Sequence, residues 1–169
     1  MTSASVRGQI ELYELFSSLG IEFEYHEHPP LATIEDAKIH WANYNSGRCK
    51  NIFVRNHKGD RHYLIILEHL RQLNIHDLEK RLKQGKLSFA SDNRLKKYLG
   101  LEPGSVSPFG LINDTEKHVH LFIDEKLKDY DRLAFHPNIN TASLVISRSD
   151  FLKFLEFTGN TFEFVRLYD

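Results

Sequence analysis

The stretch that most constrains the fold is GRCKNIFVRNHKGDRHYLIIL, residues 47–67, which has the pattern of a β-hairpin. Successive side chains of a strand point to opposite faces, so Lys50, Ile52 and Val54 share one face of its first half. The turn NHKGD offers Gly59 for a positive φ. The returning strand, RHYLIIL, is apolar over four consecutive residues, which predicts burial on both of its faces.

Lys50 is unexpected at the start of an apolar strand face. A lysine in that position either extends its ammonium to solvent at the strand end or points it into a cleft that receives an anion. The residues of the hairpin leave both alternatives open.

The rest of the chain interleaves helical and extended patterns irregularly. Helices are predicted over residues 5–19, 33–44, 74–85, 91–100 and 147–159, and further strands over residues 21–28, 87–91, 118–124, 132–135, 141–146 and 162–169. Gly85 is the predicted stop of the helix that begins at residue 74. We therefore expect an α+β fold: one compact domain over residues 1–169, with a mixed, mostly antiparallel β-sheet and flanking helices.

The net charge gives the protein no overall positive electrostatic potential that would attract nucleic acid. The formal net charge is −1, so a polyanion would have to be bound by a local patch. Basic residues do cluster locally. Such clusters can be solvated helix faces, or they can supply the phosphate contacts that a neutral protein needs to bind RNA. The clusters are Arg48, Lys50, Arg55, Lys58 and Arg61; Lys80, Arg81, Lys83 and Lys86; and Arg94, Lys96 and Lys97.

Several kinds of site find no support in the sequence. The single cysteine, Cys49, excludes an intramolecular disulfide and a cysteine-based zinc site. Two histidine pairs with two-residue spacing (His26 and His28, His118 and His120) could chelate a metal, but solvent-facing histidines on a half-buried sheet explain them without one, and no HExxH motif is present. No GxSxG, P-loop or dinucleotide fingerprint occurs. We expect no metal and no cofactor. The sequence shows no signal peptide and no stretch that could span a bilayer, so we expect a cytoplasmic protein.

Two loops have backbones that glycine and proline constrain. PGSVSPFG, residues 103–110, could point successive N–H groups into one concavity that binds an anion or a carbonyl, or could be a tight surface connection. In FHPNINT, residues 135–141, Pro137 restricts His136 to an extended backbone at a strand end. That loop could equally be an ordinary connection between strands.

Three segments together, CKNIFVRNHKGDRHYLIIL, PGSVSPFGLIND and FHPNINTASLVIS, resemble the YbaK/ProX superfamily of aminoacyl-tRNA editing domains. Within it they are most similar to the stand-alone prolyl-tRNA deacylases of the PrdX and ProXp-ala type. The resemblance implies a trans-editing deacylase that hydrolyses mischarged proline tRNA, foremost alanyl-tRNA(Pro), by attack of water on the aminoacyl ester. It also implies a mechanism without metal or covalent nucleophile.

The resemblance also assigns roles to residues. Lys50, Gly104 and His136 are the implied catalytic residues, with Lys50 at the mouth of the pocket and His136 as a group that shapes it. The residues implied to bind substrate are Asn51, Ser105, Val106, Ser107, Pro108 and Asn140. The sequence departs from the family pattern at Asn138 and Ser143, where an apolar residue and a threonine are expected, so the amino-acid specificity stays open.

Two alternatives remain at this stage. One is a deacylase with another small amino-acid specificity (cysteine, serine or proline), because pocket volume separates such groups by only a few kcal/mol. The other is a non-catalytic module that binds tRNA or a synthetase. The implied partner is aminoacylated tRNA with the proline acceptor, and prolyl-tRNA synthetase or an elongation factor is a further candidate; we expect no membrane and no DNA partner.

Overall fold

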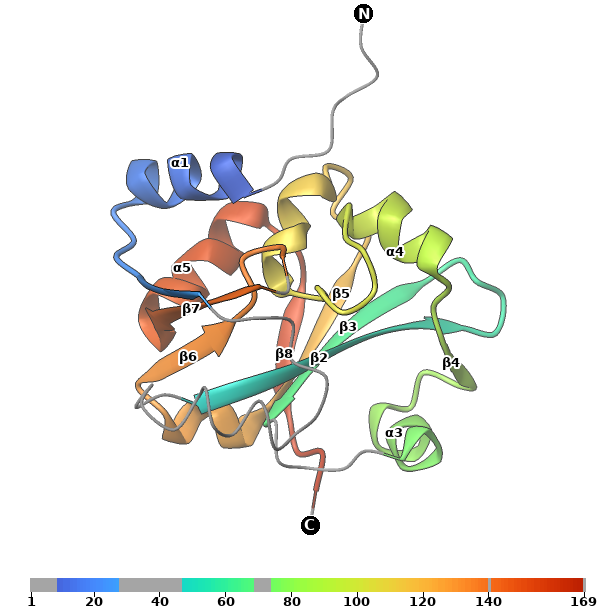
Figure 1. The fold of residues 1–169 in the computed structure, drawn as a ribbon. Coiled ribbons are helices and arrows are strands. Elements are labelled where there is room, and N and C mark those ends of the chain that lie inside the picture. Colours follow the sequence, from blue (N-terminus) through green and yellow to red (C-terminus); the bar gives the residue numbers. More distant parts are fainter. Residues whose placement is uncertain (1–8, 28–46, 69–73, 140, 169) are drawn as a thin grey trace, which may run out of the picture.

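A computed structural model describes residues 9–27, 47–68, 74–139 and 141–168 (Figure 1). The helices are α1 (Gln9–Leu19), α3 (Ile75–Leu82), α4 (Asp92–Leu99), α5 (Arg148–Thr158) and the 3-10 helices η1 (Pro108–Asn113) and η2 (Glu125–Asp129). The strands are β1 (Glu24–Glu27), β2 (Gly47–Asn56), β3 (His62–Glu68), β4 (Leu87–Phe89), β5 (His120–Asp124), β6 (Arg132–Phe135), β7 (Ala142–Ser147) and β8 (Phe162–Val165).

Among the described residues, these strands form one mixed sheet in the order β1-β7-β6-β2-β3-β5-β8, with β4 paired to β2. The pairs β1–β7, β2–β3, β2–β4 and β6–β7 are antiparallel, whereas β2–β6, β3–β5 and β5–β8 are parallel. The predicted α+β class with a mixed, mostly antiparallel sheet is therefore confirmed.

The predicted hairpin is β2 and β3. Residues 62–67 of β3 are all buried, as the apolar run predicts. In the turn, Gly59 has a φ of 72°, and the Asn56 side chain accepts hydrogen bonds from the backbone N–H groups of Asp60 and Arg61, each at 3.1 Å. This local bonding fixes the hairpin register.

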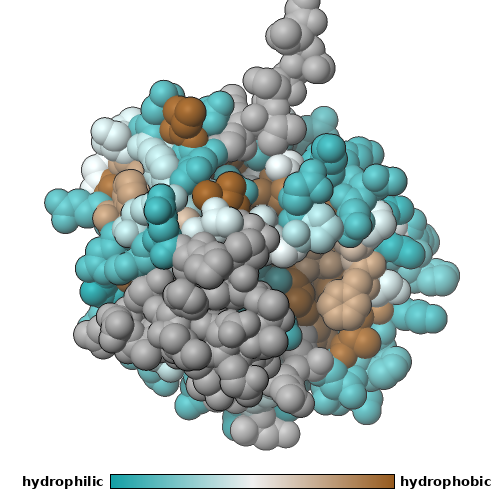
Figure 2. Space-filling view, viewed as in Figure 1, coloured by the Kyte–Doolittle hydropathy of each residue, from teal (hydrophilic) through white to brown (hydrophobic). Residues whose placement is uncertain are grey.

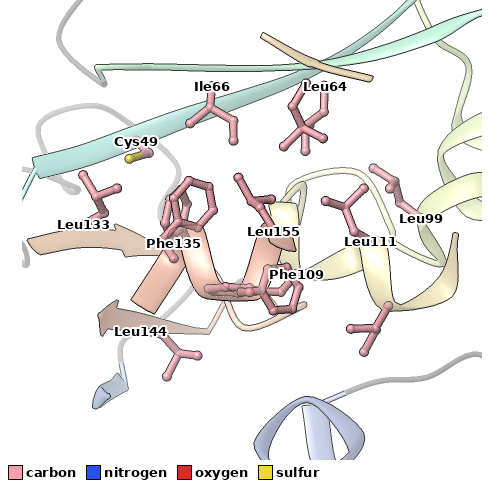
Figure 3. Packing of buried hydrophobic residues seen from close by; sticks show 14 of the residues in the cluster. Cys49, Leu64, Ile66, Leu99, Phe109, Leu111, Leu133, Phe135, Leu144 and Leu155 are labelled. Atoms are coloured by element: carbon pink, nitrogen blue, oxygen red, sulfur yellow. The ribbon is translucent and has the colours of Figure 1, made fainter. Parts of the chain in front are cut away.

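The two faces of β2 contribute to two different hydrophobic clusters. Cys49 and Phe53 belong to the larger cluster, together with residues of α1, α5 and η1 (Figure 3). Val54 lies on the opposite face, in a smaller cluster with Ile65 of β3 and with Leu78 and Leu82 of α3. Because the side chains alternate along the strand, Lys50 lies on the side of the smaller cluster.

The predicted helix over residues 74–85 is wrong at its C-terminal end. The helix stops at Leu82, and Lys83, not Gly85, is its left-handed C-cap, with φ 55° and its N–H bonded to Glu79 O at 3.1 Å. Leu82 is the last residue of α3 that reaches the core, and ending there lets the chain turn so that Leu87 enters the sheet. Gly85, with φ 79°, lies within that turn.

Helices α1, α4 and α5 occur where expected, and Gly100 and Gly159 are the left-handed C-caps of α4 and α5. The predicted helix over residues 33–44 lies outside the described residues. The 3-10 helix η1 was not predicted; Pro108 begins it and the Ser107 side chain caps it. In the described part of the chain, no helix is long and apolar enough to cross a bilayer.

Candidate active site

Lys50 lies in the middle of the sheet, on β2 opposite Leu67 of β3. Its side chain is exposed, although those of Cys49 and Leu67 are buried. Within the described part of the chain, Lys50 makes no hydrogen bond or ion pair. The structure therefore has an exposed ammonium group on its central strand.

The sheet opens along one edge of β2, next to Lys50. β3 occupies one edge of β2 from Cys49 to Arg55. On the other edge, β6 pairs only at Gly47 and Arg48, and β4 only at 54–56. Between these two pairings, the edge of β2 is not paired with any described strand.

His136 follows β6 at this opening. The parallel register places Leu133 beside Gly47 and Ala134 beside Arg48, and the pairing of the two strands ends there, two residues before His136 on one strand and two residues before Lys50 on the other. The ring of His136 is half-buried, and its Nδ1 lies 3.0 Å from the carbonyl oxygen of Ala142. Because a carbonyl only accepts, Nδ1 donates, and in a neutral ring Nε2 is then the acceptor.

The Gly104–Pro108 loop is partly exposed and partly built into the core. Gly104 is exposed with φ 87°, a conformation that glycine adopts at no steric cost. The Ser105 N–H donates to Glu102 O at 3.1 Å and the Ser107 hydroxyl accepts from Phe109 N–H at 3.2 Å. Ser105, Ser107 and Pro108 are buried, and Val106 is half-buried against the larger cluster.

The two loops are in contact with each other. Asn138 Nδ2 donates to the Phe109 carbonyl at 3.4 Å, and the rings of Phe109 and Phe135 lie edge to face with centroids 5.4 Å apart. The structure thus joins the loop that follows β6 to η1, the helix into which the Gly104–Pro108 loop leads. In the described part of the chain, no direct hydrogen bond or ion pair joins Lys50 to either loop. Asn140 lies outside the described residues.

Asn51 and Asn138 each hold a buried side-chain oxygen that accepts no hydrogen bond from the part of the chain that the structure describes. Asn51 lies on the opposite face of β2 from Lys50. Asn138 has a left-handed backbone, with φ 64°. An unpaired buried acceptor costs about 1–3 kcal/mol, so each of these two oxygens calls for an explanation, and a role in binding is one. Sequence reasoning marked Asn138 only as a departure from the family pattern and did not predict this orphaned oxygen.

The Cys49 thiol and the His62 imidazole, which could in principle serve as a nucleophile and as a general base, are both buried in the fold. The Cys49 thiol is buried, and desolvation raises its pKa above the ordinary value. His62 Nδ1 lies 2.8 Å from His118 Nε2, and Arg94 donates to His62 Nε2 at 3.0 Å. Burial, followed by the nearby positive groups, lowers the pKa of His62 to about 4.

The expected histidine pairs do not form a metal centre in the described part of the chain. His118 contacts His62, whereas His120 Nδ1 lies 2.6 Å from the Thr161 hydroxyl. His26 lies 3.2 Å from Glu24, and His28 is outside the described residues. Among the described residues, no three His, Cys, Asp or Glu side chains lie together so that they could hold a metal ion.

Comparison with known proteins decides the family. The family model of the aminoacyl-tRNA editing domain matches residues 28–154. The chain belongs to the aminoacyl-tRNA editing domain family. Prolyl-tRNA editing protein ProX of Acetoanaerobium sticklandii is 39% identical over 150 residues, which cover 88% of this chain and 91% of that protein. The prolyl-tRNA synthetase associated domain-containing protein 1 of Mus musculus is 30% identical over 164 residues, 95% of each chain.

Solved structures support the fold of this editing domain. A candidate trans-editing enzyme for prolyl-tRNA synthetase has a TM-score of 0.67 at 16% identity and covers 96% of this chain and 99% of its own. A hypothetical protein has a TM-score of 0.68 at 20% identity, and the match covers 93% of this chain and 98% of that protein. At these identities the likeness concerns the fold alone.

Proposed function

We propose that this editing domain is a hydrolase that removes the wrong amino acid from mischarged proline tRNA, with alanine as the foremost substrate. The observation that carries the proposal is the exposed ammonium of Lys50 at the open edge of β2, just past the point where β2 stops pairing with the strand that leads to His136. The family match and the prolyl-tRNA editing relative support the substrate class. Because charged tRNA is consumed in translation, the proposal includes a cytoplasmic location.

The proposed reaction is hydrolysis of an ester. A water oxygen attacks the carbonyl carbon, the bond to the ribose oxygen breaks, and that oxygen takes up a proton, which gives free amino acid and tRNA. The Lys50 ammonium, a compact and strongly hydrated cation, suits the terminal phosphate or the ester carbonyl. A positive group near the developing oxyanion would stabilise the transition state more than the ground state.

The two loops complete the proposed site. Backbone N–H groups near Gly104 would hold the terminal adenosine and aminoacyl group, but not that of Ser105, which already bonds Glu102. Val106, Ser107 and Pro108 would give the loop its shape, since they pack inward. His136, held by the Ala142 carbonyl, would shape the pocket, and Asn140 would bind substrate beside it. The side chain of Asn51 lies on the opposite face of β2 from Lys50, so any contact of Asn51 with substrate would be through its backbone at the open edge of the strand.

The test is turnover of a panel of tRNA substrates with enzyme far below substrate. The panel contains alanyl-, cysteinyl-, seryl- and prolyl-tRNA with the proline acceptor, and correctly charged alanyl-tRNA. We expect many turnovers on alanyl-tRNA(Pro) and none on correctly charged alanyl-tRNA. Faster hydrolysis of the cysteinyl or seryl ester than of the alanyl ester would mean that the enzyme is specific for that amino acid instead. Binding without turnover on every substrate would contradict the hydrolase and favour a binding module.

A further inference from the structure

The most cationic part of the chain surrounds β4. Between residues 80 and 97 the sequence has seven lysines and arginines and a single acidic residue, Asp92, although the whole chain has a net charge of −1. Arg94 points inward and bonds His62 and the Gly59 carbonyl. The lysines of this segment are exposed: Lys80, Lys83, Lys86, Lys96 and Lys97. The segment therefore offers positive charge to a polyanion that the protein as a whole does not attract.

Phe89 is the exposed aromatic side chain at the centre of this segment. It is 64% exposed, on β4 opposite Val54 of β2. Residues directly opposite each other in an antiparallel pair point to the same face. Phe89 therefore shares the face of β2 that carries the half-buried Ile52 and the exposed Lys50. Figure 2 shows apolar side chains gathered over β2 and β4, with hydrophilic side chains around them.

The spacing along this face fits a short single strand of RNA. Val54 pairs with Phe89, and it lies four residues after Lys50 on β2. Four residues of a strand extend over about 13 Å. Stacked nucleotides rise about 3.4 Å each, so about four of them span that length. This is the size of the unpaired 3′ end of a tRNA. Proteins bind single strands with aromatic side chains that stack on bases and with cations that follow the phosphates.

We propose that Phe89, with Ile52 beside it, is the stacking surface for the unpaired 3′ nucleotides of the tRNA whose aminoacyl ester lies at Lys50. The inference rests on the proposed function and adds a binding site to it. The occupant is RNA rather than an apolar protein segment because exposed lysines, which a phosphate backbone needs and an apolar segment does not, flank Phe89 on both sides in the chain.

The first experiment compares Phe89→Ala, Phe89→Tyr and Phe89→Leu with the wild type on alanyl-tRNA(Pro). Loss of a base–aromatic stack predicts that Phe89→Ala raises KM by about 5- to 150-fold, with kcat little changed. Phe89→Tyr keeps the ring and should keep the wild-type KM, whereas Phe89→Leu keeps apolar area without the ring and should not. Phe157→Ala, on α5 and 55% exposed, is the matched control.

The second substrate is alanine esterified to adenosine alone, which lacks the preceding nucleotides. The proposal predicts equal rates for the wild type and Phe89→Ala on this ester. An unchanged KM for Phe89→Ala on tRNA, an equal loss on the short ester, or rescue by Phe89→Leu would overturn the stacking surface and leave the deacylase intact.

Direct binding separates this inference from the proposed function. A fluorescently labelled RNA oligonucleotide of sequence ACCA is titrated with the wild type, Phe89→Ala and Phe157→Ala. If the wild type deacylates nothing, the proposed function fails, but weaker oligonucleotide binding by Phe89→Ala alone would still support the surface. Equal binding by all three proteins would overturn it.

Discussion

The stability of the protein should fall in mild acid because His62 must stay neutral in the folded state. Arg94 can only donate a hydrogen bond, so His62 Nε2 has to accept it and Nδ1–H donates to His118. Protonation of His62 would break the bond from Arg94 and place a charge in a side chain that is 1% exposed. Folding therefore lowers the pKa of His62 from 6.5 to about 4.

The sign and size of the effect follow from that shift. A group whose pKa is lower in the folded state binds more protons when unfolded, so stability is complete above the unfolded pKa and falls as the pH drops toward 4. The full shift corresponds to about 3 kcal/mol, of which about 2 kcal/mol is lost between pH 7.5 and pH 5.

The assay is urea unfolding of the wild type, His62→Gln and His57→Gln at pH 7.5 and pH 5. His62→Gln loses the ring packed against Tyr98 at 4.2 Å, so the pH dependence and not the absolute stability is compared. We expect the wild type and His57→Gln, altered in the exposed turn, to lose about 2 kcal/mol more than His62→Gln. An equal loss in all three proteins would refute the reasoning.

Two further predictions concern the larger core. Phe109 is fully buried and contacts the rings of Phe16, Phe135 and Phe154, so Phe109→Ala should lower the free energy of unfolding by about 3–5 kcal/mol in urea. The exposed Phe157→Ala should change it by less than about 0.5 kcal/mol; similar losses in the two variants would contradict the packing. The Cys49 thiol, whose pKa burial raises, should resist N-ethylmaleimide at pH 8 in the native protein and react in urea. Equal rates in the two states would contradict its burial.

The elements that the sequence predicts well depend on local interactions. The turn at Gly59, the helices α4 and α5 and the apolar run of β3 each involve residues close in the chain, and each is confirmed. The helix end at Lys83 was not predicted, because glycine is the usual left-handed residue and two possible stops lie close together.

The geometry of the site depends on contacts between distant residues, which the sequence does not reveal. The sequence and its family resemblance mark Lys50 and His136 as functional residues. That each of them lies two residues past the last pair of the β2–β6 ladder depends on the parallel pairing of β2 with β6, about 85 residues further along the chain. The bond from Asn138 to Phe109 and the chain of Arg94, His62 and His118 have no sequence pattern of their own.

The central claim is that Lys50 takes part in hydrolysis of the aminoacyl ester. The most direct test is multiple-turnover deacylation of alanyl-tRNA(Pro) by the wild type, Lys50→Ala and the control Lys153→Ala, an exposed lysine of α5. Loss of one stabilising donor to a developing oxyanion predicts a decrease of about 100- to 1000-fold in kcat for Lys50→Ala, with an unchanged melting temperature. Lys153→Ala should keep the wild-type rate. Full activity of a folded Lys50→Ala protein would contradict the account.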